Sequence, residues 1–96
     1  MNITKTNFKK QFDNGNSFMI YVTKSPEVAE EIHKIHALNK AILPEGWYYS
    51  VQTVRVCQDC RVPKFFHDCD YWATIITHNK GDWNDKHSTY EVYIAE

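Results

Sequence analysis

The chain has 96 residues and a mass of 11.4 kDa, which is enough for one hydrophobic core and excludes a multidomain protein. Hydrophobic residues make up 43% of it and there are only three Gly and three Pro, so we expect one globular domain over residues 1–96. Eleven basic against twelve acidic residues give a formal charge of −1, which argues against a non-specific nucleic-acid binder and against an acidic nucleic-acid mimic.

The N-terminal part of the chain predicts a short helix followed by a strand. Phe8 and Phe12 are four residues apart within residues 4–13, and Asn14-Gly15 follows as a helix stop. A strand that turns at Asn14-Gly15 is the alternative, because Asn-Gly also favours hairpins. Residues 17–23 alternate apolar side chains on two faces, which predicts a largely buried strand.

The helix signals that begin at residue 25 predict a long amphipathic helix. Ser25 suits the N-cap, Pro26 the first helical position, and Glu27 the positive end of the helix dipole. Apolar residues then recur at spacings of three and four until Pro44, at Val28, Ile32, Ile35, Leu38 and Ile42. This pattern predicts about four turns with one apolar face toward a core.

Three further strands are expected at residues 47–57, 71–77 and 88–95, with a polar turn at 78–87. The apolar positions of the first of these change parity after Val51, so we expect a β-bulge near Gln52 or Thr53. The element order predicts an α+β domain in which one long helix packs on a four-stranded, mainly antiparallel sheet, with a short N-terminal helix.

The cysteines predict a metal site. They form the pattern C-x2-C-x6-H-x-C at Cys57, Cys60, His67 and Cys69. Zinc prefers four such ligands in a tetrahedral arrangement, and the two pairs flank an expected hairpin loop. We therefore expect one structural zinc ion, with uncoordinated cysteines and reversible thiol chemistry as the alternatives.

The sequence predicts no catalytic residues. Cys60 and His67 are the residue types of a thiolate–imidazole pair, which keeps a small thiol enzyme as an alternative. No third orienting group, oxyanion motif or Gly-rich phosphate loop accompanies them. A protein without enzymatic activity is the favoured interpretation.

The fourteen aromatic residues exceed what one helix is expected to cover, so some should lie on the surface and contact a partner. The candidate partner-binding residues are Phe65, Phe66, Trp83, Arg61 and Lys64. Arg55, Arg61 and Lys64 would contact phosphates in a zinc-stabilised nucleic-acid-binding module, which is a further alternative. An edge strand, expected to be 17–23 or 88–95, would allow a homodimer or strand addition to a target.

The targeting signals predict a cytoplasmic protein without a membrane partner. No apolar run approaches the roughly 20 residues that span a bilayer, and residues 1–5 lack the apolar stretch of a secretory signal. An odd number of cysteines also agrees better with a reducing compartment than with a disulfide framework.

Residues 18–56 resemble, in layout, small bacteriophage proteins that inhibit host machinery, among them certain anti-CRISPR proteins and phage inhibitors of bacterial RNA polymerase. The strand 18–22 leads into Ser25-Pro26-Glu27, and Pro44-Glu45-Gly46-Trp47 leads into a strand that ends at 54–56. The Cys/His segment departs from those proteins, so no binding residue is carried over. The resemblance implies a non-catalytic protein in the host cytoplasm that inhibits a bacterial defence or host protein or nucleoprotein complex.

Overall fold

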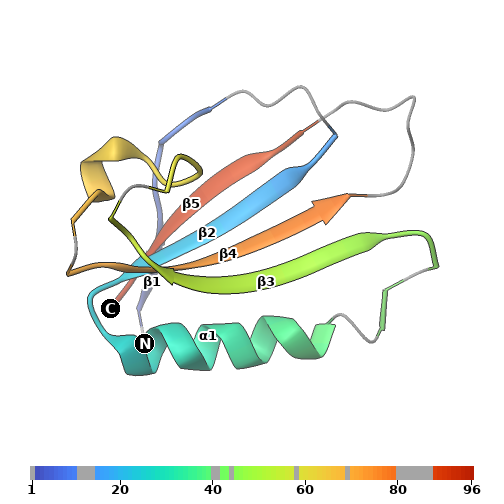
Figure 1. The fold of residues 1–96 in the computed structure, drawn as a ribbon, viewed down its shortest axis with the longest axis horizontal. Coiled ribbons are helices and arrows are strands. Elements are labelled where there is room, and N and C mark those ends of the chain that lie inside the picture. Colours follow the sequence, from blue (N-terminus) through green and yellow to red (C-terminus); the bar gives the residue numbers. More distant parts are fainter. Residues whose placement is uncertain are drawn as a thin grey trace.

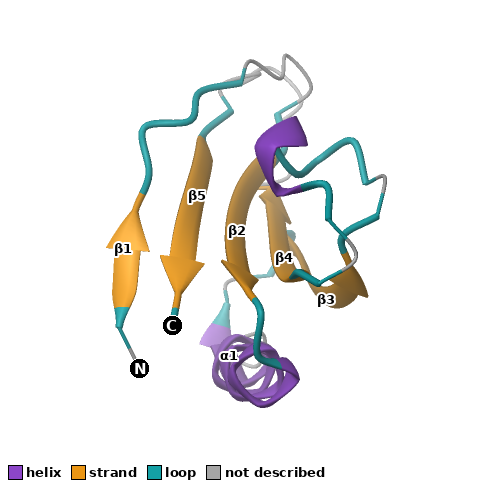
Figure 2. Ribbon diagram, turned by 90° about the vertical axis from the view of Figure 1, so that its left-hand side faces the viewer, coloured by secondary structure: helices purple, strands orange, loops and turns teal. Residues whose placement is uncertain are grey.

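The computed structural model describes residues 2–10, 15–39, 42–43, 45–57, 59–68, 70–79 and 88–96. Within these residues the fold is α+β, with one long helix on one side of a five-stranded mixed sheet (Figures 1 and 2). The elements in chain order are β1 (Ile3–Lys5), β2 (Ser17–Thr23), α1 (Pro26–Asn39), β3 (Tyr48–Arg55), the 3-10 turn η2 (Lys64–Phe66), β4 (Trp72–Asn79) and β5 (Tyr90–Ala95).

The strand order is β1-β5-β2-β4-β3, and it differs from the expected sheet in two respects. The sheet has a fifth strand, β1, and it is mixed, because β5 pairs parallel to β2 while the other neighbours are antiparallel. The strands 17–23 and 88–95 were the expected edges. They are interior strands, and the edges are β1 and β3.

The expected N-terminal helix is wrong for the described part of residues 4–13, because residues 3–5 form β1 and residues 6–10 have no regular structure. β1 pairs with β5, and the backbones of Asn2 and Glu96 exchange hydrogen bonds of 2.9 and 2.8 Å. A helix of about ten residues is marginal without tertiary packing, so this ladder prevails. The hairpin alternative is wrong too, since β1 pairs with β5 rather than with β2.

The predicted start of the long helix α1 is confirmed, but its buried face contains fewer of the apolar residues than predicted. The Ser25 hydroxyl accepts a 3.3 Å bond from the Val28 amide, which caps the helix. Ala29 and Ile32 are buried against the sheet, but Leu38 is 76% exposed. Leu38 is six residues beyond Ile32 and so lies about 120° around the helix from it. Leu38 therefore lies on the outer side of α1, and Ile35, which is 51% exposed, lies at the edge of the buried side.

The expected bulge in the strand after α1 is wrong. β3 and β4 pair residue for residue from Tyr48 with Asn79 to Arg55 with Trp72. The apolar pattern changes parity because both faces of β3 are covered: Val51 packs with the core beneath α1, and Val54 packs with the core on the opposite face. A strand that is buried on both sides does not need alternation.

Residues 56–71 form a third layer on the face of the sheet opposite to α1 (Figure 2). The segment buries Val56, Val62 and Phe66 against side chains of β2, β4 and β5. Apart from η2 it has no helix or strand among its described residues. None of the helices in the described part of the chain is long and apolar enough to cross a membrane.

Candidate functional site

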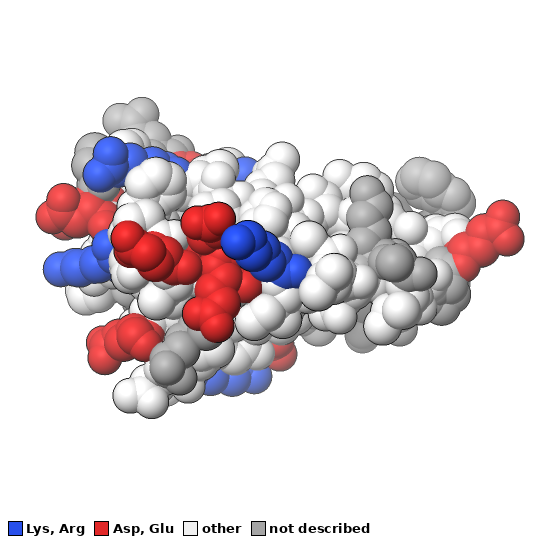
Figure 3. Space-filling view, turned by 90° about the horizontal axis from the view of Figure 1, so that it is seen from below, with Lys and Arg blue, Asp and Glu red and all other residues white. Residues whose placement is uncertain are grey.

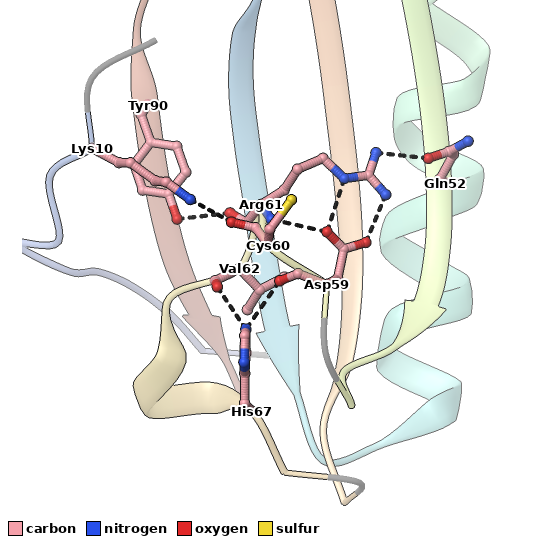
Figure 4. Close-up of polar contacts among 8 residues, drawn as sticks. All are labelled: Lys10, Gln52, Asp59, Cys60, Arg61, Val62, His67 and Tyr90. Carbon is pink, nitrogen blue, oxygen red and sulfur yellow. Dashed lines mark hydrogen bonds and ion pairs between the residues drawn. The ribbon is translucent and has the colours of Figure 1, made fainter.

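The turn at residues 59–62 organises the segment that covers the sheet, and His67 holds it in place (Figure 4). The Val62 amide donates to the Asp59 carbonyl at 3.0 Å. The His67 Nε2 atom lies 3.0 Å from that carbonyl oxygen and 2.8 Å from the Val62 carbonyl oxygen. Because carbonyl oxygens only accept, Nε2 carries the proton and donates to both.

An ion pair between Asp59 and Arg61 fixes the same turn to the sheet. The Arg61 Nε and Nη2 atoms donate to the two carboxylate oxygens of Asp59 at 3.0 and 2.7 Å, and Nη1 donates to Gln52 Oε1 on β3 at 2.9 Å. Hydrogen bonds from Arg61 lower the pKa of Asp59, and the Asp59 carboxylate raises the pKa of Arg61. Both groups stay charged at neutral pH, so the Arg61 side chain is committed to this contact.

Two residues from distant parts of the chain complete the attachment. The Tyr90 hydroxyl on β5 donates to the Arg61 carbonyl at 2.8 Å, and burial raises the pKa of Tyr90 to about 12, so the phenol keeps its proton. The Lys10 ammonium donates to the Cys60 carbonyl. The N-terminal segment, β5 and residues 59–62 therefore meet at one place (Figure 4).

An exposed pair of aromatic rings lies beside this turn. Phe65 is 78% exposed and Phe8 is 37% exposed, with ring centroids 6.2 Å apart. Both rings contact Phe66, which is 1% exposed, at centroid distances of 5.2 and 5.4 Å in edge-on geometry. A core residue thus supports two surface phenylalanines from below.

A pocket of about 360 Å³ lies beside the Phe8 ring, and lysines line it as well. Phe8, Val62 and Pro63 line the pocket together with the exposed lysines Lys9, Lys10 and Lys64. We call the set Phe8, Phe65, Lys9, Lys10 and Lys64 the aromatic–basic surface. It combines an apolar hollow with positive charge, which suits a ligand that carries an apolar group among acidic ones.

A second pocket, of about 620 Å³, lies over the other end of the same sheet face. Most of its lining is uncharged and polar, including Ser50, Gln52, Thr77 and Asn79. The charged side chain in this lining is Arg61, which Asp59 already neutralises. This pocket lacks the charge and the exposed pair of rings found on the aromatic–basic surface.

Of the predicted partner-binding residues, the structure places some on the surface and some in the core. Phe65 and Lys64 are exposed as expected, whereas Phe66 is buried in the core, so its side chain is not a surface contact. Arg61 is half-buried and paired with Asp59, and Trp83 lies outside the described residues. Phe8, Lys9 and Lys10 were not among the predicted residues, because they fall within the expected N-terminal helix; the run of one aromatic and two basic residues was the available signal.

The predicted zinc ligands are not assembled in the described part of the chain. Cys57 and Cys60 are both exposed, and Cys69 lies outside the described residues. The Cys60 thiol points away from the His67 ring (Figure 4), so the thiolate–imidazole pair is not formed either. Within the described ranges, no three His, Cys, Asp or Glu side chains form a group that could hold a metal ion. Nδ1 is the His67 nitrogen that remains for a ligand, since Nε2 is a donor.

The three candidate phosphate contacts do not share one face. The Arg55 guanidinium lies 5.1 Å from the Trp72 ring, and the register of β3 with β4 places this pair on the α1 side of the sheet. Lys64 belongs to the segment on the opposite side. Arg61 is engaged by Asp59.

Comparisons of the chain with protein-family models, with curated proteins and with solved structures found no match.

Proposed function

We propose that this protein is a non-catalytic binding protein that contacts its partner through the aromatic–basic surface. One observation carries the proposal: the Phe65 side chain is 78% exposed, and its ring packs edge-on against the buried ring of Phe66. Exposed aromatic side chains in fixed positions are frequent anchors of protein interfaces, because they bury a large area and lose little conformational freedom. A partner that covers the Phe65 ring would bury apolar area that is exposed to water in the free protein.

The charges around Phe65 select the chemistry of the partner. Lys9, Lys10 and Lys64 give this surface a positive potential, although the whole chain has a formal charge of −1. We infer an acidic protein surface with an apolar group that enters the 360 Å³ pocket. Such a complex forms faster at low salt, since complementary charges steer the encounter.

The layout resemblance to phage inhibitors suggests where this partner is found. We propose that it is a component of a bacterial defence system or of the host transcription machinery, as a protein or a nucleoprotein complex, and that the chain inhibits it by occupying its surface. Such inhibition is stoichiometric and requires no turnover. The cell compartment is then the bacterial cytoplasm.

The test is capture from a bacterial lysate with the tagged protein and matched variants. Phe65→Ala and Lys64→Glu change the aromatic–basic surface, and Leu38→Ala removes an apolar residue of almost equal exposure, 76%, from the opposite side of the molecule. We expect the wild type and Leu38→Ala to retain the same bound protein, and both surface variants to lose it. If Phe65→Ala retained the bound protein and Leu38→Ala lost it, the interface would be on α1 and the proposal would be wrong.

Single-stranded nucleic acid is the second candidate partner, and the position of Lys64 next to the exposed Phe65 ring favours it. Bases stack on exposed rings while lysines contact phosphates. Arg61 does not contribute, since it is paired with Asp59, so few cations remain for phosphate contacts. Nuclease treatment of the captured material separates the candidates: a nucleic acid is degraded and released, whereas a protein partner remains bound.

The structural zinc site also remains a proposal, with Cys57, Cys60, His67 and Cys69 as ligands. The bonds of His67 Nε2 to two backbone carbonyls support it in part, because zinc-bound histidines usually donate their second nitrogen to such a group. The hypothesis predicts one bound zinc per chain in reduced protein supplied with zinc, and loss of this ion in Cys60→Ser. Metal analysis that finds no zinc in the supplied wild type would refute it.

A further inference from the structure

The two edges of the sheet differ in how they are protected against pairing with another strand. β1 is three residues long, and its Lys5 forms an ion pair with Glu91 at 3.3 Å. β3 is eight residues long and contains neither proline nor a bulge. From Tyr48 to Val54 it also contains no charged residue. Charges, prolines, bulges and short length are the usual means of blocking an edge, so β3 lacks the protection that β1 has.

The register identifies the backbone groups at the open edge of β3. The Val56 amide donates to the Tyr71 carbonyl at 2.9 Å, and the same ladder pairs Val54 with Ala73. Hydrogen-bonded and non-hydrogen-bonded pairs alternate in an antiparallel ladder. Residues 50, 52 and 54 therefore bond to β4, and Tyr49, Val51 and Thr53 direct their amide and carbonyl groups outward. No backbone group of Tyr49, Val51 or Thr53 has a hydrogen-bond partner elsewhere in the described ranges.

The composition of β3 fits a second copy of itself as the occupant of this edge. Tyr, Val and Thr are favourable in cross-strand pairs. Arg55, at the C-terminal end of β3, is its one charged residue. Antiparallel pairing of two copies puts the two Arg55 residues at opposite ends of the new ladder, whereas parallel pairing would place like charges side by side.

We propose that two copies of this chain form a homodimer by antiparallel pairing of their β3 strands about Val51. Tyr49 of each copy then bonds to Thr53 of the other, and Val51 bonds to its own counterpart, so all three outward residues gain partners. The two five-stranded sheets become one continuous sheet. β2 and β4 separate β3 from β5, so this contact does not use the pocket of the aromatic–basic surface. The homodimer is independent of the proposed function.

The test combines the mass of the protein in solution with an edge variant and a matched control. Val51→Pro removes an outward amide and leaves the bonds between β3 and β4, because proline is tolerated on an edge strand where its nitrogen faces away from the sheet. Val51→Ala removes side-chain volume and keeps the amide. We expect light scattering to give dimers for the wild type and Val51→Ala and monomers for a folded Val51→Pro. A wild type that is monomeric at every concentration, or a Val51→Pro that still dimerises, would overturn the proposal.

Amide hydrogen exchange of the wild type decides the case even where Val51→Pro does not fold. The amides of residues 50, 52 and 54 should be protected at all protein concentrations. The amides of Tyr49, Val51 and Thr53 should exchange fast in dilute protein and become protected as the concentration rises. Fast exchange of these three amides in a protein that is dimeric by mass would place the interface elsewhere and refute the proposal.

Discussion

The two faces of the sheet are covered in different ways. On one face, α1 satisfies its own backbone hydrogen bonds and packs through Ala29 and Ile32. On the other face, the described residues between 56 and 71 have little regular structure, so side chains satisfy several of their carbonyl groups. Tyr90 and Lys10 fulfil this role from outside the segment, and His67 does so from within it. An irregular covering layer thus depends on individual polar contacts, whereas a helical layer depends mainly on apolar burial.

The helical face nevertheless has one chain of polar contacts. The Thr74 hydroxyl donates to the Ala29 carbonyl at 3.2 Å, which leaves its oxygen to accept from Thr53 at 3.1 Å. The Thr53 oxygen can then accept from His33 Nδ1 at 2.8 Å. This chain fixes the neutral His33 tautomer with the proton on Nδ1 and connects α1 to β3 and β4.

The outer side of α1 is another surface with exposed apolar residues. Charged side chains gather over its N-terminal half, and the other half is mainly uncharged (Figure 3). Ile35 and Leu38 lie in that second half, and Ile42 follows it at 80% exposure. The pocket that Lys9, Lys10 and Lys64 line lies instead beside Phe8, on the opposite side of the sheet. This contrast makes Leu38 a suitable control for Phe65.

The largest expected effect comes from two neighbouring phenylalanines in the irregular layer. Phe66→Ala removes a ring that is 1% exposed and should lower the free energy of unfolding by about 3–5 kcal/mol. Phe65→Ala should change it by less than about 0.5 kcal/mol, because the ring is exposed. Chemical denaturation of both variants measures the difference. Equal destabilisation would mean that Phe65 belongs to the core rather than to a binding surface.

The same comparison applies to the helical face. Ile32 is 2% exposed, and Ile32→Ala should cost about 2–5 kcal/mol. Leu38→Ala should again stay within about 0.5 kcal/mol of the wild type. Denaturation curves provide the test. A large loss in Leu38→Ala would show that the outer side of α1 is covered in solution, for example by a second molecule.

His67→Ala tests whether polar contacts hold the irregular layer. The variant removes the donor to the Val62 carbonyl and one of two donors to the Asp59 carbonyl, which should cost about 1–3 kcal/mol. We expect faster hydrogen exchange and proteolysis within residues 56–71 and little change in α1. His33→Ala on the helical face is the control. In this variant, hydrogen exchange should increase near Thr53 and not near Asp59. Uniform loosening of the whole domain in His67→Ala would contradict a local role.

The smallest expected effect is a pH dependence from the Asp59–Arg61 pair. Hydrogen bonds from Arg61 lower the pKa of Asp59 in the folded protein. The pair therefore stabilises the fold at pH values above about 4, the pKa of an unfolded aspartate, and this contribution is lost as the pH falls through the folded pKa. Asp59→Asn should lower the stability at neutral pH by roughly 1 kcal/mol and converge with the wild type in acid.

Thermal melting over a range of pH measures this effect, and Arg61→Met supplies the reciprocal variant, since it removes the cation that lowers the pKa of Asp59. Both variants should flatten the acid side of the stability curve. A curve for either variant that stays parallel to the wild type at all pH values would show that the pair does not contribute.

Sequence patterns predicted those helices and strands that are determined by neighbouring residues in the chain. The alternating residues of β2 and the Ser25-Pro26 start of α1 are examples, and the structure confirms both. β1 escaped prediction because three residues carry almost no pattern, and its stability comes from β5 at the far end of the chain. The apolar spacing of α1 suggested that Leu38 is buried, yet the sheet reaches only the side of the helix that carries Ala29 and Ile32.

The candidate site was predicted only in part for the same reason. Phe65 and Lys64 belong to a segment that looked like a loop, and the structure leaves both exposed. Phe8 and Lys10 come from the other end of the sequence, and no local pattern indicates that they meet residues 60–65. Phe65 and Phe66 are also chemically identical neighbours. Which of them is buried depends on the direction of one 3-10 turn.

The most direct test of the proposed binding surface is the Kd of the captured and purified partner for the wild type, Phe65→Ala and Leu38→Ala. If Phe65 anchors the complex, its removal should weaken binding by at least about 30-fold, corresponding to about 2 kcal/mol or more. Leu38→Ala should leave the Kd within about twofold of the wild type. An unchanged Kd for Phe65→Ala would contradict the central claim that the aromatic–basic surface binds the partner.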